Sequence, residues 1–470
     1  MFQWKWNIFK DLNLCPNHCN MEIHLLDVGT REYGDCIIVH NDKKRILIDG
    51  AHKGDSALLK KQMKAIFEEE GPYHFDLLVV THLHDDHIGC LPELIKNGDI
   101  TLAKSLLMNP VFRWKEGGVD TITGHDGFVD ALLEEDHSFL PDDELEQFLV
   151  DAAGLVDRYG DMIKALKNQG KVIFFNGVDA TDFSTLEKEF SSLGMKILGP
   201  TKKHLKLTQT ALLGVVDTLK DFVSSSAFTD TAVQPADRYR RLFAGTATDS
   251  LLVMDAAKNK GSINNESIIL KFSQKGPKGW TAMLSGDMQF AVPEVAGLDA
   301  EMTKLLSKVN SSGPYDFIKT SHHTSYNGLS EEMMDQWISD GTEFFGHSGG
   351  LYDPSHPEPD VLKALKERED KIQYARTDRN GLIRVAQDEN GELSMWITKG
   401  DVNNFAKNKD KPRNDDQSVT EPVSTENKPK DKPSTTVVSS GDSSQLQFSA
   451  TIPENRHVRI TIEIDGEKKN

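Results

Sequence analysis

The chain has 470 residues, of which 38% are hydrophobic, and it carries a formal net charge of −19. This apolar content is enough for one large domain with insertions, and no apolar run approaches the roughly 20 residues that a membrane helix needs, so we expect no membrane association. The negative charge argues against tight, non-specific binding of nucleic-acid duplexes, although bound divalent cations reverse the local sign at a site.

The N-terminus and the cysteines bear on the compartment. Residues 1–20 have neither the apolar stretch nor the small-residue cleavage site of a signal peptide, so we predict a short N-terminal arm. The cysteines are too few and too scattered for a disulfide framework; they are Cys15, Cys19, Cys36 and Cys90. Reduced thiols and the lack of an export signal predict a cytoplasmic protein.

Strands and helices alternate in the first part of the chain. We expect strands at 21–28, 36–41 and 45–50, a helix over 55–69, a buried strand at 75–80, a helix from Ile88 to about Lys96, and a strand starting at Ser105. Residues from about 111 to 250 differ, because they carry long acidic helical stretches interrupted by two strand-like runs, KVIFF and MKILGP. We predict a mainly helical insertion over the core.

Strand patterns return at 267–272 and 281–287, followed by a helix around 298–309 and further alternating strands and helices to about residue 387. This order predicts an α/β fold, an αββα sandwich of mixed sheets with helices outside, over residues 21–400. Residues 401–443 are low-complexity and predict a disordered linker. Residues 444–470 alternate with period two around Pro453, which predicts a β-hairpin that docks on a sheet edge of this chain or of a protein partner.

The sharpest feature is the segment Thr81-His82-Leu83-His84-Asp85-Asp86-His87, which directly follows a buried strand. His82 and His84 are two residues apart, so they point the same way from an extended loop, while Asp86 and His87 stand where the next helix begins. Imidazole and carboxylate groups are the ligands of Zn²⁺, Mn²⁺ or Fe. The segment therefore predicts a metal site.

HLHDDHIG resembles the HxHxDH motif of metallo-β-lactamase-fold hydrolases. The surrounding segments are similar to one branch, the ComEC-type domain of bacterial DNA-uptake proteins and its soluble relatives. They are LLDVGTREYGDCIIVH, ILIDGA, NNESIILKF, MLSGD, IKTSHHTSYNG with Thr324 where glycine is usual, SHPEPDVLKAL and RTDRNGLIRV. The resemblance spans about residues 21–390 without the insertion, and it says little about the substrate.

The resemblance implies roles for individual residues. His82 and His84 would bind one divalent metal ion, Asp86 and His87 a second, and Asp287 would bridge both. His322 would complete the second site, with His323 lining the cleft. Two such ions, zinc or manganese, would activate a water molecule, and Asp86, His87 and His323 would be the catalytic residues.

Further residues are predicted to support or flank the metal ligands. Asp49 would hold a ligand imidazole by its other nitrogen, Lys319 would touch a phosphate oxygen, and Ser325 would flank the histidine pair. Many enzymes of this fold add a histidine to the first metal, and the candidates are His125, His137 and His204. None lies in a recognisable motif, and we expect surface histidines there. The ComEC-type branch often lacks this ligand, so the first metal would be weakly held, or replaced by solvent and a carboxylate.

Three functions remain open. The first is a phosphodiesterase, in particular a nuclease that acts on phosphodiester or nucleic-acid substrates, in line with the resemblance. The second is a hydrolase of a small ester, lactone or amide, which the charge of −19 favours. The third is a partner-binding subunit of a multi-protein system with a relic site, but the intact ligand set argues against a dead enzyme.

Overall fold

Runs of β-branched and aliphatic residues form the strands of two large sheets. The computed structural model describes residues 20–29, 33–109, 128–134, 137–223, 234–243, 262–388 and 390–408. The chain divides into two compact units, Met1–Pro412 and Arg413–Asn470, and every described residue lies in the first. The predicted arm (except residue 20), the predicted hairpin and the linker beyond residue 408 lie outside the described residues.

The first sheet has eight strands; the half from β16 to β3 is antiparallel, and the half from β3 to β8 is parallel. All residues of β5 are buried, as expected for a strand covered on both faces. In spatial order the strands are β16 (Leu393–Ile397), β15 (Ile383–Gln387), β1 (Glu22–Leu25), β2 (Ile37–His40), β3 (Arg45–Ile48), β5 (Leu77–Val80), β7 (Lys104–Met108) and β8 (Lys171–Phe175). A separate parallel pair joins β4 (Tyr73–Phe75) to β6 (Ile100–Leu102).

The second sheet has six strands. Its β10–β11 hairpin is antiparallel, with Leu270 opposite Leu284, and the strands from β11 to β14 run parallel. In spatial order they are β14 (Gln373–Arg376), β13 (Phe344–His347), β12 (Phe317–Lys319), β11 (Thr281–Leu284), β10 (Ile269–Ser273) and β9 (Lys196–Gly199).

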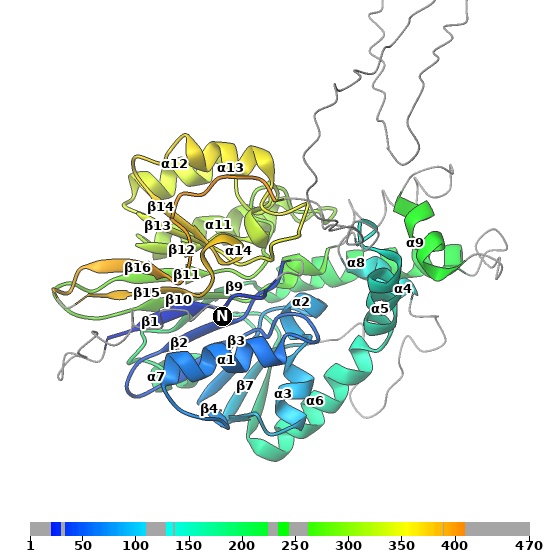
Figure 1. Cartoon of the computed structure of the whole chain (residues 1–470), viewed down its shortest axis with the longest axis horizontal. Helices are drawn as coiled ribbons and strands as arrows, with labels where there is room; N and C mark the ends of the chain where they lie inside the picture. Colours follow the sequence, from blue (N-terminus) through cyan, green and yellow to red (C-terminus); the bar gives the residue numbers. More distant parts are fainter. Residues whose placement is uncertain are drawn as a thin grey trace, which may run out of the picture. The chain divides into compact units, whose positions relative to one another are not determined.

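The two sheets share one hydrophobic core, which joins Leu25 and Val385 of the first sheet to Leu284 and Phe317 of the second. Helices cover the outer faces (Figure 1). On the first sheet they are α1 (Ser56–Phe67), α3 (Leu91–Lys96), α6 (Leu155–Gln169) and α7 (Ser184–Glu189), and on the second α11 (Asp299–Ser312), α12 (Glu331–Ser339) and α13 (Pro359–Lys366). The predicted αββα sandwich is confirmed.

The insertion is smaller than predicted, because its two strand-like runs complete the sandwich. KVIFF forms β8 at the edge of the first sheet, and MKILGP contributes β9 to the edge of the second. The remaining helices gather at one end of the sheets (Figure 1) and form a hydrophobic cluster that includes Leu145, Leu212 and Tyr239. They are α4 (Phe128–Leu133), α5 (Asp142–Ala153), α8 (Lys202–Val223) and α9 (Pro235–Phe243).

Residues 401–408 were assigned to the linker but pack against the sandwich. The guanidinium of Arg376, which is fully buried, donates to the carbonyl oxygens of Asn404 (3.2 Å) and Ala406 (2.7 Å) and to Asn408 Oδ1 (3.0 Å). A linker would therefore begin later than residue 401. Within the described part of the chain, no helix is both long enough and apolar enough to cross a bilayer.

Candidate metal centre

Three strand ends bring the motif residues together. The segment after β5 carries His82 and His84 and continues into α2 (Asp85–Ile88), Asp287 follows β11, and the short turn η2 (His322–Thr324) follows β12. Because β11 and β12 are parallel neighbours, the groups that follow them emerge at the same edge of the second sheet.

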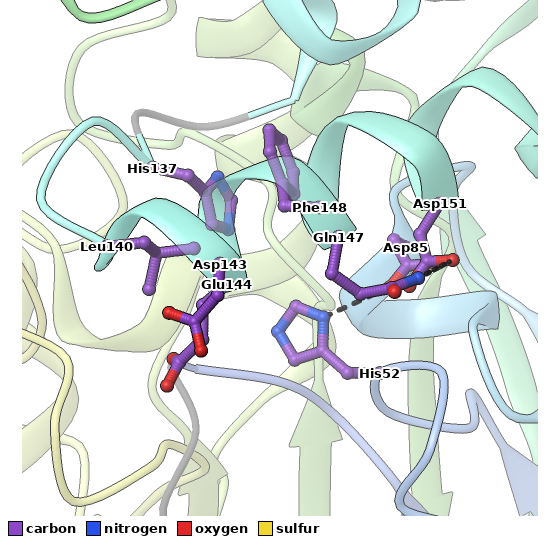
Figure 2. Close-up of a pocket in the computed structure, with 9 residues that line it drawn as sticks. All are labelled: His52, Asp85, His137, Leu140, Asp143, Glu144, Gln147, Phe148 and Asp151. Atoms are coloured by element: carbon purple, nitrogen blue, oxygen red, sulfur yellow. Dashed lines mark hydrogen bonds and ion pairs between the residues drawn. The ribbon is translucent and has the colours of Figure 1, made fainter. Parts of the chain in front are cut away.

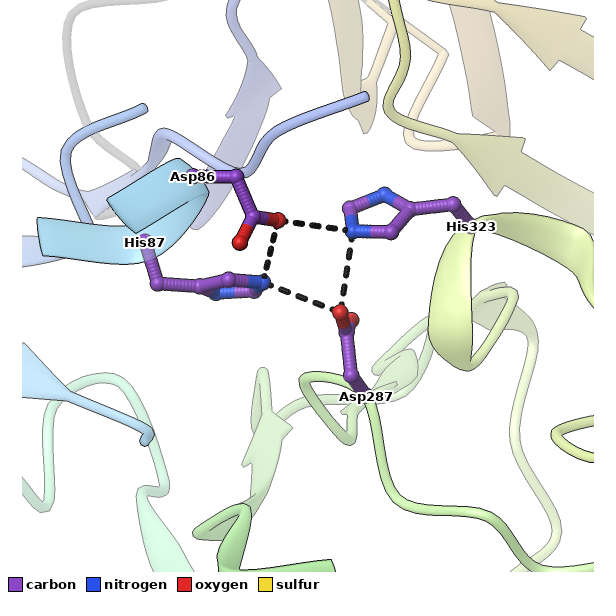
Figure 3. Close-up of side chains that lie close together, drawn as sticks. All are labelled: Asp86, His87, Asp287 and His323. Carbon is purple, nitrogen blue, oxygen red and sulfur yellow. Dashed lines mark hydrogen bonds and ion pairs between the residues drawn. The ribbon is translucent and has the colours of Figure 1, made fainter. Parts of the chain in front are cut away.

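Four buried side chains form a closed cluster: Asp86, His87, Asp287 and His323 (Figure 3). His87 Nε2 lies 3.0 Å from both Asp86 Oδ2 and Asp287 Oδ2. His323 Nε2 lies 3.1 Å from Asp86 Oδ2 and 2.9 Å from Asp287 Oδ2. Tetrahedral ligands about 2.0–2.1 Å from a zinc ion lie about 3.3 Å apart, so these separations fit a metal.

The far nitrogens of both imidazoles are held by acceptors. His87 Nδ1 lies 2.7 Å from Asp49 Oδ2, and His323 Nδ1 lies 2.8 Å from the carbonyl oxygen of Ser348. An Nδ1–H that donates to an acceptor leaves the Nε2 lone pair of a neutral imidazole facing the cluster, the usual arrangement of metal-binding histidines. Asp49 thus lies where the sequence placed it, against a predicted ligand.

The cluster requires positive charge. Two carboxylates and two imidazole lone pairs meet in a space closed to water, which is costly without a cation between them. Burial lowers the pKa of His323, but Asp287 and Asp86 outweigh burial and raise that pKa to about 10. A divalent ion held by the same four atoms would take the place of those protons.

Lys319 is part of this charge balance and does not face a substrate. Its side chain is fully buried, with Nζ 2.5 Å from Asp35 Oδ2 and 3.4 Å from Asp287 Oδ1. Burial alone would lower the pKa of Lys319, yet Asp35 and Asp287 raise it, so the ammonium stays charged. The predicted contact with a phosphate oxygen is therefore replaced by a structural one, in which Lys319 fixes the orientation of Asp287.

His82 and His84, the predicted ligands of the first metal, lie beside the cluster. His82 Nε2 lies 3.3 Å from His84 Nδ1 and 4.0 Å from Asp287 Oδ2. Burial, with His87 and His84 alongside, holds the pKa of His82 well below its usual value, so the imidazole is neutral. Asp287 consequently faces both ligand sets, as a bridging carboxylate would.

The structure places the two neighbouring histidines differently from the resemblance. His323, which was expected to line the cleft, enters the cluster, whereas His322 Nε2 lies 2.8 Å from Asn264 Nδ2 and His322 Nδ1 lies 2.5 Å from Asn327 Oδ1. The backbone explains the exchange, because His322, His323 and Thr324 all have positive φ, at 47°, 44° and 64°. Such conformations cost about 1–3 kcal/mol each in residues with a side chain and concentrate at functional sites.

The remaining candidates lie elsewhere. Ser325 Oγ donates to Glu358 Oε1 at 3.3 Å, outside the cluster. Of the histidines considered for the first metal, His125 lies outside the described residues. His204 and His137 are buried, contrary to the surface positions expected: His204 Nε2 donates to Asn265 O at 2.8 Å, and the His137 ring stacks on Phe148 with centroids 4.0 Å apart.

A pocket of about 120 Å³ lies beside the centre, between the sandwich and the insertion (Figure 2). The Tyr33 ring connects the two, since its centroid lies 4.9 Å from that of His323, 5.0 Å from that of His356 and 6.0 Å from that of His137. The lining is mostly acidic or aromatic and consists of His52, Asp85, His137, Leu140, Asp143, Glu144, Gln147, Phe148 and Asp151.

Three residues of the site had no assigned role. Asp35 belongs to the YGDC segment that carried part of the resemblance, so that motif could have indicated it. Tyr33 stands two residues earlier. Glu134, in the insertion, groups with His84 and Asp86 through ligand atoms that all lie within 4.8 Å of one another. No sequence motif marks Glu134.

A family model and a curated relative each match part of the chain. Residues 29–159 match the family model described as the metallo-β-lactamase superfamily, whose members are in general metal-dependent hydrolases. A stretch of 60 residues is 40% identical to the coenzyme F₄₂₀H₂ oxidase of Methanocaldococcus jannaschii and covers 13% of this chain and 14% of that protein.

Three solved structures, two of them metallo-β-lactamases, are similar over much of the chain at low identity. MIM-1 from Novosphingobium pentaromativorans is 9% identical, with 74% of this chain and 89% of that one covered and a TM-score of 0.27. The hydrolase AbOPH of the β-lactamase superfamily is 14% identical, with coverage of 67% and 90% and a TM-score of 0.29. BJP-1 of Bradyrhizobium japonicum, of subclass B3, is 10% identical, with coverage of 74% and 90% and a TM-score of 0.27.

Proposed function

We propose that this chain, which contains a metallo-β-lactamase-superfamily domain, is a metal-dependent phosphodiesterase. The observation that carries the proposal is the position of Asp287, whose Oδ2 lies 3.0 Å from His87 Nε2 and 4.0 Å from His82 Nε2. One carboxylate between two ligand sets is the arrangement of two-metal hydrolases. Two divalent ions, zinc or manganese given these donor atoms, would supply a nucleophile at neutral pH and neutralise charge on a phosphodiester.

The residues of the chain would orient these parts. Asp49 holds the His87 imidazole, Ser348 O holds that of His323, and Lys319 holds the second oxygen of Asp287. These partners fix the donor atoms before a substrate arrives, so little reorganisation is needed at the moment of reaction. The Tyr33 ring lies between the His323 ring (centroids 4.9 Å apart) and the His137 ring of the pocket lining (6.0 Å).

The choice of phosphodiesters rests on the likeness of the motif segments to the ComEC-type branch, and we propose a nuclease or a related activity within it. The acidic lining limits which polyanions would enter. Asp143 and Glu144 stand at the pocket, so a nucleic acid would have to be short, single-stranded or presented by its end.

The same pocket favours a second candidate, a hydrolase of a small ester, lactone or amide. A space of about 120 Å³ with acidic walls fits a compact, neutral or cationic substrate better than a long polyanion. Both candidates use the same metal centre and differ only in the bond cleaved.

A substrate panel separates the two. Purified protein, loaded with Zn²⁺ or Mn²⁺, would be assayed against bis(p-nitrophenyl) phosphate, single- and double-stranded DNA oligonucleotides, RNA and a lactone series, with the Asp86→Ala/His87→Ala double variant as the control. We expect cleavage of the diester and of short single strands. Turnover of lactones or esters alone, lost in the double variant, would instead establish the second candidate.

A further inference from the structure

The histidine pair at the first site, His82 and His84, faces Asp287, and His84 also groups with Asp86. His84 Nε2 lies 3.1 Å from the carbonyl oxygen of Leu133, so that nitrogen carries the proton and Nδ1 has the lone pair. Thr81 Oγ1 donates to Asp49 at 2.6 Å and accepts from His82 Nδ1 at 3.2 Å, which leaves the lone pair of His82 on Nε2. These two nitrogen atoms, His82 Nε2 and His84 Nδ1, are 3.3 Å apart. Zinc ions in proteins have three or four protein ligands, so two imidazoles need further ligands to hold a divalent ion tightly.

The insertion brings a carboxylate to this place. Glu134 is 9% exposed, its Oε2 accepts from the Asp85 backbone N–H at 3.1 Å, and it groups with His84 and Asp86 within 4.8 Å. We propose that Glu134 joins His82 and His84 as the third unshared protein ligand of the first metal, in the place that a histidine takes in many enzymes of this fold. This inference rests on the proposed metal-dependent function.

The position of Glu134 couples metal binding to the insertion. Glu134 directly follows α4, whose Ala131, Leu132 and Leu133 pack into the hydrophobic cluster of the insertion helices. The Leu133 carbonyl already holds His84, and the Glu134 carboxylate holds the Asp85 N–H. If Glu134 binds the first metal, metal binding stabilises the packing of the insertion against the sandwich. By reciprocity, this packing increases the metal affinity by the same factor.

Metal titration of the full-length protein tests the proposal without an activity assay. Zinc stoichiometry and affinity would be measured against a competing chelator, and Co²⁺ absorption would report the ligand field. The variants are Glu134→Gln, which keeps size and an acceptor for Asp85, and Glu146→Gln, which removes the same charge from an exposed position on α5. Glu134→Asp is a milder change, and thermal unfolding would show that each variant is folded.

We expect two zinc equivalents for the wild type and for Glu146→Gln. Glu134→Gln should bind the weaker equivalent at least tenfold less tightly, with a changed Co²⁺ spectrum, and Glu134→Asp should fall between them. Unchanged affinity in Glu134→Gln, or a wild type that binds one equivalent only, would overturn the proposal. If the wild type binds two zinc equivalents and Glu134→Gln shows the expected loss of affinity, but no phosphodiester is cleaved, the proposed function is contradicted while the role of Glu134 stands.

Discussion

Asp49 Oδ2 lies 2.7 Å from Nδ1 of His87, and both side chains are fully buried. Asp49 also accepts from the backbone N–H of Thr81 at 2.8 Å and from its hydroxyl at 2.6 Å. The carboxylate thereby joins the end of β3 to the start of the HxHxDH segment and fixes the orientation of one predicted ligand.

This geometry predicts different effects for two aspartates. Asp49→Asn keeps every ligand and should weaken metal binding by about 10- to 100-fold, the usual cost of losing such a supporting partner. Asp287→Asn removes charge from a carboxylate that faces both ligand sets, so it should lower the stoichiometry of both ions. Metal analysis of the dialysed variants measures the number of bound ions. Equal metal loss in Asp49→Asn and Asp287→Asn would contradict the different roles given to the two aspartates.

The adjacent histidines predict a second contrast. His323→Ala should lose the ion of the four-residue cluster, because it removes one of the four atoms that lie 2.9–3.1 Å apart. His322→Ala should keep that ion, since His322 contacts Asn264 and Asn327 instead. The zinc content of the two variants shows which of the two histidines is a metal ligand. Loss of the ion in His322→Ala, with retention in His323→Ala, would restore the assignment made from the resemblance.

The C-terminal boundary can be tested by two truncations. A chain that ends at Asn408 keeps all the described acceptors of Arg376, whereas one that ends at Gly400 leaves this buried guanidinium short of three of them. We expect the longer form to keep wild-type stability and model-diester turnover, and the shorter form to lose roughly 3 kcal/mol. Urea unfolding compares them. Equal stability would show that residues 401–408 contribute nothing.

Residues 409–470 are predicted to serve association. The period-two pattern at 444–470 favours a hairpin that adds to a sheet edge of a partner. Removal of this segment should therefore weaken binding to a partner or to a second copy without changing turnover, which sedimentation and pull-down with the full chain would measure. A large fall in turnover of the monomer would instead mean that this segment completes the catalytic domain.

The acidic pocket predicts an unusual salt response. Raising the ionic strength from about 0.01 M to 0.1 M shortens the Debye length from roughly 30 Å to 10 Å and weakens repulsion of a polyanion. Cleavage of long single strands should then rise or stay constant, and Asp143→Asn should raise it at low salt, unlike Asp161→Asn on the exposed face of α6. A steep loss with salt on duplex DNA would indicate a basic binding face instead.

The sequence predicted the layered fold because hydrophobic periodicity reports burial directly. Nearly every strand expected from 21–50 and 267–387 is present, but β8 and β9 were assigned to the insertion, because a strand's partner cannot be deduced from its own residues. The edge strand β16 was missed, since all its residues are only partly buried and their pattern is weak.

Residue type and spacing were enough to predict which segments of the chain supply the candidate metal cluster. The HxHxDH motif and Asp287, which follows MLSG, identify candidate metal ligands from the sequence. The choice between His322 and His323 depends on the backbone, because three consecutive residues there have left-handed conformations. Lys319 was misjudged for a similar reason. Its partner Asp35 stands near the other end of the domain's sequence, and only the tertiary fold brings the two charges together.

The most direct test of the account combines metal analysis with turnover in the Asp86→Ala/His87→Ala double variant. The variant removes two of the four cluster ligands, and we predict that it loses at least one metal equivalent and all measurable phosphodiester cleavage while its circular dichroism stays close to that of the wild type. Wild-type turnover in a folded double variant would contradict the account, because the chemistry would then take place elsewhere.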